Sequence, residues 1–165
     1  MRFAYADPPY PGQARKLYHC SEIDHRILIN SLELNWPDGW ALSTSSSALK
    51  SILELCPDDV RVAAWVKPFA SFKPGVNPAY TWEPVIWRGG RPRARDEPTA
   101  RDHLSEPITL QKGLCGAKPL AFNLWILELL GFLPGEDTLD DLFPGTRGMS
   151  RALSQVRSQA TLVVI

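Results

Sequence analysis

Short apolar runs alternate with helical apolar patterns along the first half of the chain. Three compact apolar runs have the composition of buried strands: Arg2–Ala6, Trp40–Leu42 and Val60–Val66. Between them, apolar residues recur at helical spacing over 23–34 and over 49–55, and Pro57 ends the second pattern. The order strand, helix, strand, helix, strand predicts an α/β layered fold with a largely parallel sheet.

The second half of the chain continues with the same two patterns. Trp82–Trp87 alternates as a strand does, and Pro119–Leu130 has the strongest helical pattern, with proline in its first turn and Gly131 after it. Beyond it we expect a strand over Thr138–Phe143 and a short helix over residues 149–156. A last apolar strand is expected over Thr161–Ile165. Neither an internal repeat nor a linker interrupts the pattern, so residues 1–165 are predicted to form a single domain.

The composition is that of a globular protein without a strong overall charge. Hydrophobic residues make up 44% of the chain, and the 18 Lys and Arg residues balance the 18 Asp and Glu residues. Contact with nucleic acid must therefore come from a local basic patch. The widely spaced Cys20, Cys56 and Cys115 favour reduced thiols in a cytoplasmic protein and no metal site. No apolar run reaches membrane-spanning length and no signal-peptide pattern is present, so we expect no membrane contact.

The most basic loop follows the strand that ends at Trp87. Residues 88–103 contain glycine and proline, and five arginines against three acidic residues leave a charge of about +2. One interpretation is a mobile, solvated loop around residues 88–104. The other is phosphate contact by Arg88, Arg91 and Arg93.

The segment Asp7-Pro8-Pro9-Tyr10 directly follows the first predicted strand. Both prolines fix their φ angles and lack a backbone donor, and each restricts the residue before it to extended conformations. The chain therefore leaves the strand as a stiff corner that holds a carboxylate, a free carbonyl oxygen and an aromatic ring in fixed relation. These are the groups needed to hold a planar base that carries an exocyclic amine. A proline-fixed surface turn is the alternative interpretation.

A strand, an acidic residue and a small-residue loop that opens a helix follow one another over residues 140–148. The glycines of this loop let backbone amides approach a ligand, and the N-terminus of a helix is electropositive. The arrangement suits a nucleoside cofactor, although many ordinary strand–helix turns also contain glycine.

The corner and a second segment together resemble motifs of a known family, the S-adenosylmethionine-dependent methyltransferases that modify the adenine amino group in nucleic acid. The second segment is Asp141-Leu142-Phe143-Pro144-Gly145-Thr146. Segments between them resemble the small phage-type members of that family: Trp65-Val66-Lys67-Pro68, Trp82-Glu83-Pro84-Val85-Ile86, Arg88-Gly89-Gly90 and Gly116-Ala117-Lys118-Pro119. The chain is also similar to the enzymes that methylate adenine in messenger RNA. The corner precedes the cofactor loop, as in the circularly permuted groups of the family.

The resemblance implies a compact, circularly permuted, Rossmann-like methyltransferase sheet with helices on both faces and S-adenosylmethionine as cofactor. In such a sheet the strand before the corner and the strand before the cofactor loop are neighbours. Asp7 and the Pro8 carbonyl would accept the two hydrogens of the amine, and Tyr10 would stack on the base. The family's catalytic motif falls on Asp7, Pro8, Pro9 and Tyr10. Its cofactor-binding positions fall on Lys118, Pro119, Asp141, Phe143, Gly145 and Thr146.

Other positions are assigned less directly by the resemblance. Lys67 is expected to touch cofactor or nucleic acid, whereas Glu83 could equally anchor a loop through an arginine. Arg147 stands where the family usually has glycine, and no acidic residue follows the last predicted strand, where the family commonly holds the cofactor ribose. The tryptophans of the strands are expected to belong to the core rather than to stack on a base: Trp65, Trp82 and Trp87.

The leading function predicted from the sequence is methyl transfer from S-adenosylmethionine to the 6-amino group of adenine in DNA. Methylation of adenine in RNA is the alternative within the same chemistry. The cytosine amine is less favoured, because enzymes of that group more often have serine at the position of Asp7. A methyltransferase-like nucleic-acid-binding subunit without catalysis is the alternative from a different class, motivated by Arg147 and by the missing ribose carboxylate. A chain without a separate recognition domain could also act as a homodimer.

Overall fold

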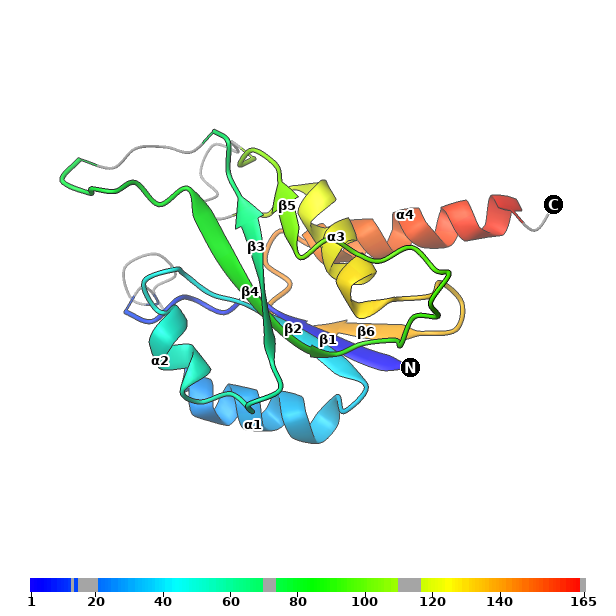
Figure 1. The fold of residues 1–165 in the computed structure, drawn as a ribbon, viewed down its shortest axis with the longest axis horizontal. Helices are drawn as coiled ribbons and strands as arrows, with labels where there is room; N and C mark the ends of the chain where they lie inside the picture. The colour runs from blue at the N-terminus through cyan, green and yellow to red at the C-terminus, as the bar shows by residue number, and fades with distance from the viewer. Residues whose placement is uncertain (13, 15–20, 70–73, 110–116, 164–165) are drawn as a thin grey trace.

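One sheet of six strands forms the centre of the fold over the residues that the computed structural model describes, namely 1–12, 14, 21–69, 74–109 and 117–163. The strand order is β5-β3-β4-β2-β1-β6 (Figure 1). The strands are β1 (Arg2–Ala6), β2 (Gly39–Ser43), β3 (Arg61–Val66), β4 (Trp82–Gly89), β5 (His103–Ser105) and β6 (Thr138–Asp141). The helices are α1 (His25–Asn35), α2 (Leu49–Leu53), α3 (Leu120–Leu130) and α4 (Gly148–Val163).

Strand β4 makes the sheet mixed rather than largely parallel. β1 pairs in parallel with β2 and β6, and β3 pairs in parallel with β5, but β4 runs antiparallel to both of its neighbours, β2 and β3. The prediction of a largely parallel sheet is therefore wrong for β4. A parallel neighbour needs a crossover connection, usually a helix. The chain between β3 and β4 instead contains Pro68, Pro74 and Pro78, which oppose a helix.

Helices cover both faces of the sheet, as predicted. Alternate residues of β1 enter two separate apolar cores, because successive side chains of a strand point to opposite faces. Phe3 and Tyr5 pack with residues of α3 and α4, whereas Ala4 and Ala6 pack with residues of α1 and α2. Figure 1 shows the two pairs of helices on opposite sides of the sheet. β1 is thus buried on both faces, which fixes the point at which its carboxyl end emerges.

Helix α3 is strongly apolar and agrees with its predicted span. Pro119 is its N-cap residue, and Gly131 ends it in the left-handed conformation with a φ of 66°. The ring of Phe122 packs on that of Trp65 with 5.2 Å between the centroids. Trp65 is buried, which confirms its assignment to the core, and Trp87 is half-buried against the same core. α3 therefore holds Lys118 and Pro119, which directly precede it, beside the sheet.

The chain departs from its predicted elements at two further places. α4 continues to Val163, so residues 161–163 are helical instead of forming the expected strand, and residues 164–165 lie outside the described residues. No glycine or proline between Val156 and Thr161 ends the helix, so its hydrogen-bond ladder continues. In the predicted loop, His103–Ser105 forms the edge strand β5, which is too short for a hydrophobic period to reveal.

Candidate active site

Five strands present their carboxyl ends, and β4 its amino end, at one edge of the sheet. These five are β1, β2, β3, β5 and β6. The corner leaves β1 there, and Tyr5 of β1 is in register with Asp141 of β6. The amide of Leu142 donates to the Tyr5 carbonyl at 2.9 Å. The corner and the loop after β6 thus start side by side, as expected, at the edge where open α/β sheets bind their ligands.

Five charged or phenolic side chains converge at this edge and are called here the polar cluster: Asp7, Tyr10, Lys67, Glu83 and Lys118. They come from the corner, from the end of β3, from the start of β4 and from residues 117–119, which are called here the segment before α3. Two carboxylates balance two ammonium groups, which is the condition for keeping charges away from water. The sheet therefore brings together residues that are far apart in the sequence.

Lys118 lies at the centre of the polar cluster. Its Nζ donates to the Tyr10 hydroxyl and to Glu83 Oε2, each at 2.9 Å, and lies 3.3 Å from Asp7 Oδ1. Three aromatic rings, including that of Tyr10, have their centroids within 5.7 Å of Nζ. Burial alone would lower the pKa of Lys118, but the carboxylates of Asp7 and Glu83 outweigh burial and raise it. The ammonium therefore stays charged.

Glu83 is the most connected carboxylate of the polar cluster. It accepts from Lys67 Nζ at 2.9 Å, from Lys118 Nζ at 2.9 Å and from the Tyr10 hydroxyl at 2.7 Å. Burial opposes ionisation, but the ammonium groups of Lys118 and Lys67 lower the pKa of Glu83 to about 2. In these contacts the basic partners of Glu83 are two lysines, whereas an arginine was one of the two alternatives in the sequence. What the sequence offered for these contacts was only the position of Glu83 as an acidic residue inside a strand, between Trp82 and Pro84.

Asp7 has the opposite electrostatic character to Glu83. Burial raises the pKa of the Asp7 carboxyl; Lys118 opposes the rise and the charge of Glu83 adds to it. Beneath the corner, the Tyr5 hydroxyl lies 2.9 Å from Ser43 Oγ, and burial raises the pKa of Tyr5 well above that of a free phenol. The sequence did not single out this pair. In the sequence, the pair was indicated only by Tyr5, which is a polar aromatic residue inside an otherwise apolar strand.

The loop after β6 has the open backbone that a nucleoside ligand needs. Asp141 Oδ1 accepts from the amide of Phe143 at 3.3 Å, and burial, with a smaller effect of the Asp7 charge, raises the pKa of Asp141. At Gly145, which has a φ of 38°, an added Cβ would meet only the Phe143 carbonyl, at 3.7 Å. The space beside Gly145 is therefore open, and the loop leads directly into the electropositive N-terminus of α4.

Arg147 has the backbone conformation of a glycine. Among the described residues it is the non-glycine residue with a positive φ, 57°. Its amide donates to the Pro144 carbonyl at 2.6 Å, and its side chain is exposed. At the next residue, an added Cβ on Gly148 would lie 2.8 Å from Nδ2 of the buried Asn123. The loop thus keeps the path of a glycine-containing turn despite the arginine.

The three arginines expected to bind nucleic acid are not brought to the polar cluster. Arg88 bonds to Asp59 and Glu33 at 2.7 and 2.6 Å. Arg91 pairs with Asp137 at 2.8 Å, and Arg93 donates to two backbone carbonyls.

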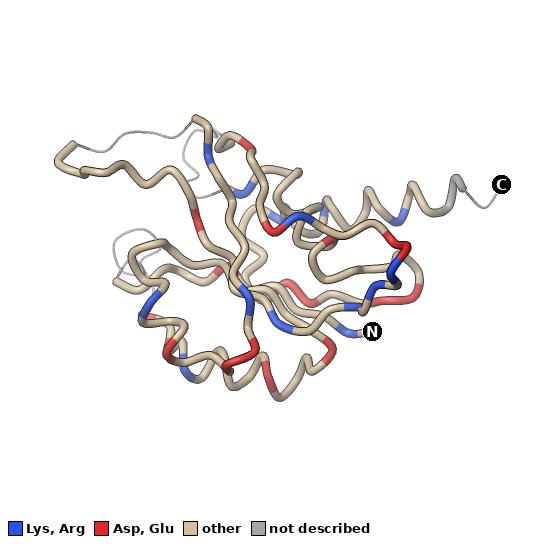
Figure 2. Tube along the Cα trace, viewed as in Figure 1, with Lys and Arg blue, Asp and Glu red and all other residues tan. Residues whose placement is uncertain are grey.

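These contacts lie near the amino end of β2 and before β6, at the opposite edge of the sheet from Asp7. Figure 2 shows basic and acidic residues interspersed along the chain. Within the described ranges the predicted basic loop is anchored by its own arginines, and contact with nucleic acid there stays a prediction.

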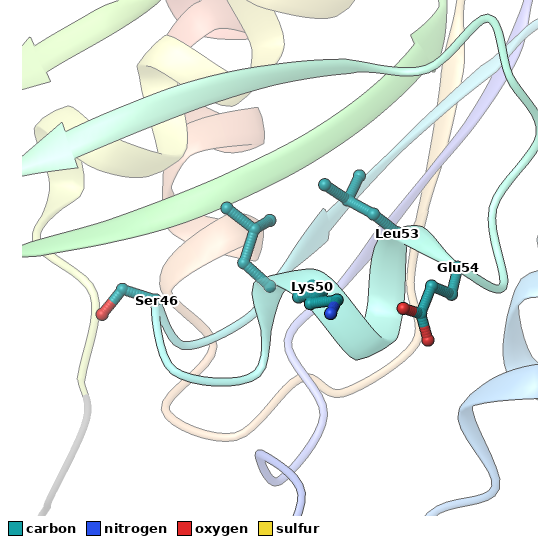
Figure 3. Close-up of a pocket in the computed structure, with 5 residues that line it drawn as sticks. Ser46, Lys50, Leu53 and Glu54 are labelled. Atoms are coloured by element: carbon teal, nitrogen blue, oxygen red, sulfur yellow. The ribbon is translucent and has the colours of Figure 1, made fainter.

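Two surface hollows lie apart from the polar cluster and share no residue with it. The first is lined on and near α2 by Ser46, Leu49, Lys50, Leu53 and Glu54 (Figure 3). The second lies between β5 and α3. In the described part of the chain, no three His, Cys, Asp or Glu side chains are grouped as metal ligands, and no helix is both long and apolar enough to cross a membrane. Cys20, Cys115 and Gly116 lie outside the described residues.

The sheet and its helices form the Rossmann-like α/β fold of methyltransferases. The fold is similar to that of "M1.HpyAVI-SAM complex", with a TM-score of 0.63, 17% identity, and coverage of 94% of this chain and 78% of that chain. A structure titled "M1.HpyAVI" is similar with a TM-score of 0.60 and 16% identity, over 94% of this chain and 76% of that chain. No protein-family model and no curated protein matches the chain. The likeness concerns the fold, and the circular permutation stays a prediction.

Proposed function

We propose that the protein transfers a methyl group from S-adenosylmethionine to the 6-amino group of adenine in DNA. One observation carries the proposal: the corner at 7–10 and the loop at 141–147 leave neighbouring parallel strands at the same edge of the sheet. Acceptors for an amine and a loop suited to a nucleoside therefore start side by side. The fold supports the choice of cofactor, because M1.HpyAVI, which has a similar fold, is described as a SAM complex.

The loop after β6 fits the cofactor in shape and charge. The open turn at Gly145 leaves room for a ligand against the backbone, and the N-terminus of α4 attracts the negative end of its amino-acid group. The residues that would hold it are Lys118, Pro119, Asp141, Phe143, Gly145 and Thr146. When bound, S-adenosylmethionine supplies a methyl group already activated by its positive sulfur. The protein then contributes mainly by positioning the amine.

The corner would prepare the amine for reaction. The adenine amine is a poor nucleophile because its lone pair is delocalised into the ring. Hydrogen bonds to Asp7 and to the Pro8 carbonyl would move the nitrogen towards tetrahedral geometry and free the lone pair. The nitrogen loses one proton when it gains a methyl group, and the raised pKa of Asp7 suits its carboxylate to accept that proton.

Tyr10 would bind the base itself. Its hydroxyl is fixed by Glu83 and Lys118, so the ring is held in one orientation at the corner. Stacking of a base on such a ring contributes roughly 1–3 kcal/mol. A base in a duplex must leave the helix to reach this position. Among the residues expected to contact nucleic acid, Lys67 is the one that lies in the polar cluster.

Transfer of labelled methyl groups tests the proposal. Incubation with methyl-labelled S-adenosylmethionine and adenine-containing DNA should label the DNA. Asp7→Ala should abolish transfer and leave cofactor binding, measured by calorimetry, within about twofold. Asp102→Asn removes an exposed carboxylate outside the polar cluster and should retain full transfer. Label on RNA alone would move the proposal to RNA, and no label on either nucleic acid with cofactor bound would refute it.

A nucleic-acid-binding subunit without catalysis is the second candidate function. Arg147 favours it, because a large cation replaces glycine in the proposed cofactor loop. Calorimetry separates the two candidates: heat of binding with S-adenosylmethionine supports the enzyme. Binding of nucleic acid without binding of the cofactor supports the subunit.

A further inference from the structure

The carboxylate of Glu83 joins three separate segments of the candidate active site. Oε1 accepts from Lys67 at the end of β3, and Oε2 accepts from Lys118 before α3 and from Tyr10 in the corner. All three distances lie between 2.7 and 2.9 Å. Hydrogen bonds to charged groups at such distances are the strong ones in proteins. Glu83 therefore links the corner to the segment before α3.

Glu83 itself is held by the sheet. It lies on β4 in register with Trp65 of β3, and the amide of Lys67 closes the same strand pair by donating to the Thr81 carbonyl at 2.8 Å. The corner and the segment before α3, in contrast, are not strands or helices. A site residue is positioned more accurately by a strand than by a loop. Glu83 is thus the rigid partner in these contacts.

The ammonium of Lys118 occupies a donor position at Asp7 that a substrate amine would need. Nζ lies 3.3 Å from Asp7 Oδ1 but 2.9 Å from Glu83 Oε2. When an amine donates to Asp7, the ammonium loses one partner and keeps Glu83. Without Glu83, Lys118 would have Asp7 as its remaining carboxylate among these contacts and would compete with the amine.

We propose that Glu83 is a positioning residue for the methyl transfer: it fixes the Tyr10 ring and retains the Lys118 ammonium while the substrate amine takes its place at Asp7. The inference rests on the proposed function. Glu83 acts through Tyr10 and Lys118 and need not touch base or cofactor.

The charge of Glu83 also gives the proposal a readout that packing would not affect. The ionisable side chains facing Glu83 and Asp7 from the surrounding elements are Tyr5, Tyr10, Lys67, Lys118 and Asp141. Burial, and after it the charge of Glu83, raises the pKa of Asp7. Removing that charge lowers the pKa of Asp7. Since Asp7 must be ionised to accept hydrogens, the acid limb of the activity profile then moves to lower pH.

Glu83→Gln tests the inference, because glutamine keeps the size and an acceptor oxygen but loses the charge. We expect kcat to fall at least about tenfold, as for other misplaced catalytic groups. The acid limb of kcat should move to lower pH. Asp59→Asn, which removes an exposed carboxylate paired with Arg88, is the matched control and should change neither property.

A second variant keeps the test informative if Glu83→Gln does not fold. Tyr10→Phe keeps the ring and removes the hydroxyl, which donates to Glu83 and accepts from Lys118, and it should lower kcat about three- to tenfold. If wild type transfers methyl groups and a folded Glu83→Gln does so at the same rate with the same acid limb, this inference alone is overturned. Full activity of Tyr10→Phe beside an unfolded Glu83→Gln would also overturn it. If wild type binds cofactor and nucleic acid but transfers nothing, the proposed function fails first.

Discussion

Replacing Arg147 by glycine should stabilise the protein. Arg147 has a φ of 57° at the step from the loop after β6 into α4, and its side chain is exposed. A side chain makes this left-handed conformation unfavourable, because Cβ approaches the following carbonyl oxygen. Glycine removes the cost and retains the hydrogen bond from the amide of residue 147 to the Pro144 carbonyl.

The magnitude follows from two opposing contributions. An L-residue in the left-handed region costs about 1–2 kcal/mol. Glycine has more freedom to lose on folding, which costs about 0.4–1 kcal/mol. The midpoints of the two ranges, about 1.5 and about 0.7 kcal/mol, leave a net gain of about 0.8 kcal/mol in the free energy of unfolding. For a chain of this length the gain corresponds to a rise of roughly 1–4 °C in Tm.

Thermal and urea unfolding of Arg147→Gly and Arg147→Ala measure the effect. Alanine loses the guanidinium but keeps Cβ, so its stability should stay within about 0.5 kcal/mol of wild type. A difference between glycine and alanine isolates the backbone conformation from the charge. Equal stabilities for the two variants, or a loss of stability in Arg147→Gly, would refute the reasoning.

Two further substitutions test the packing around the site. Tyr5→Phe leaves the Ser43 hydroxyl without its buried partner and should lower the free energy of unfolding by about 1–2 kcal/mol. Tyr80→Phe, at an exposed tyrosine, should leave it unchanged, and equal effects of the two would contradict the bond. Gly148→Ala places a Cβ 2.8 Å from Nδ2 of Asn123 and should cost about 1–3 kcal/mol through overpacking. An unchanged or higher Tm would contradict the close approach of α4 to α3.

The elements that the sequence predicted well are those with strong local signals. β1 is a compact apolar run ended by Asp7-Pro8-Pro9, and α3 has a continuous helical pattern between Pro119 and Gly131. In both cases proline or glycine marks a boundary through its own backbone preference. The neighbourhood of the corner and the loop after β6 followed from the resemblance, and the parallel pairing of β1 with β6 agrees with it.

Features that depend on distant parts of the chain could not be predicted. The antiparallel direction of β4 and the formation of β5 are both decided by pairing with β3. Such pairing produces no hydrophobic periodicity that could be recognised in the sequence. The contacts of Glu83 depend on Lys67 and Lys118, whose ammonium groups only the folded sheet brings within 2.9 Å. Arg88 looked free for phosphate in the sequence, because its partners Glu33 and Asp59 lie on other elements.

Identification of the methylated nucleoside tests the central claim most directly. DNA incubated with the protein and S-adenosylmethionine is digested to nucleosides and analysed by mass spectrometry, with Asp7→Asn as the matched control. Wild type should give deoxyadenosine carrying one methyl group on its 6-amino nitrogen, and the variant should give none. Methyl groups on cytosine or on a ring nitrogen, or no methylated nucleoside although the cofactor binds, would contradict it.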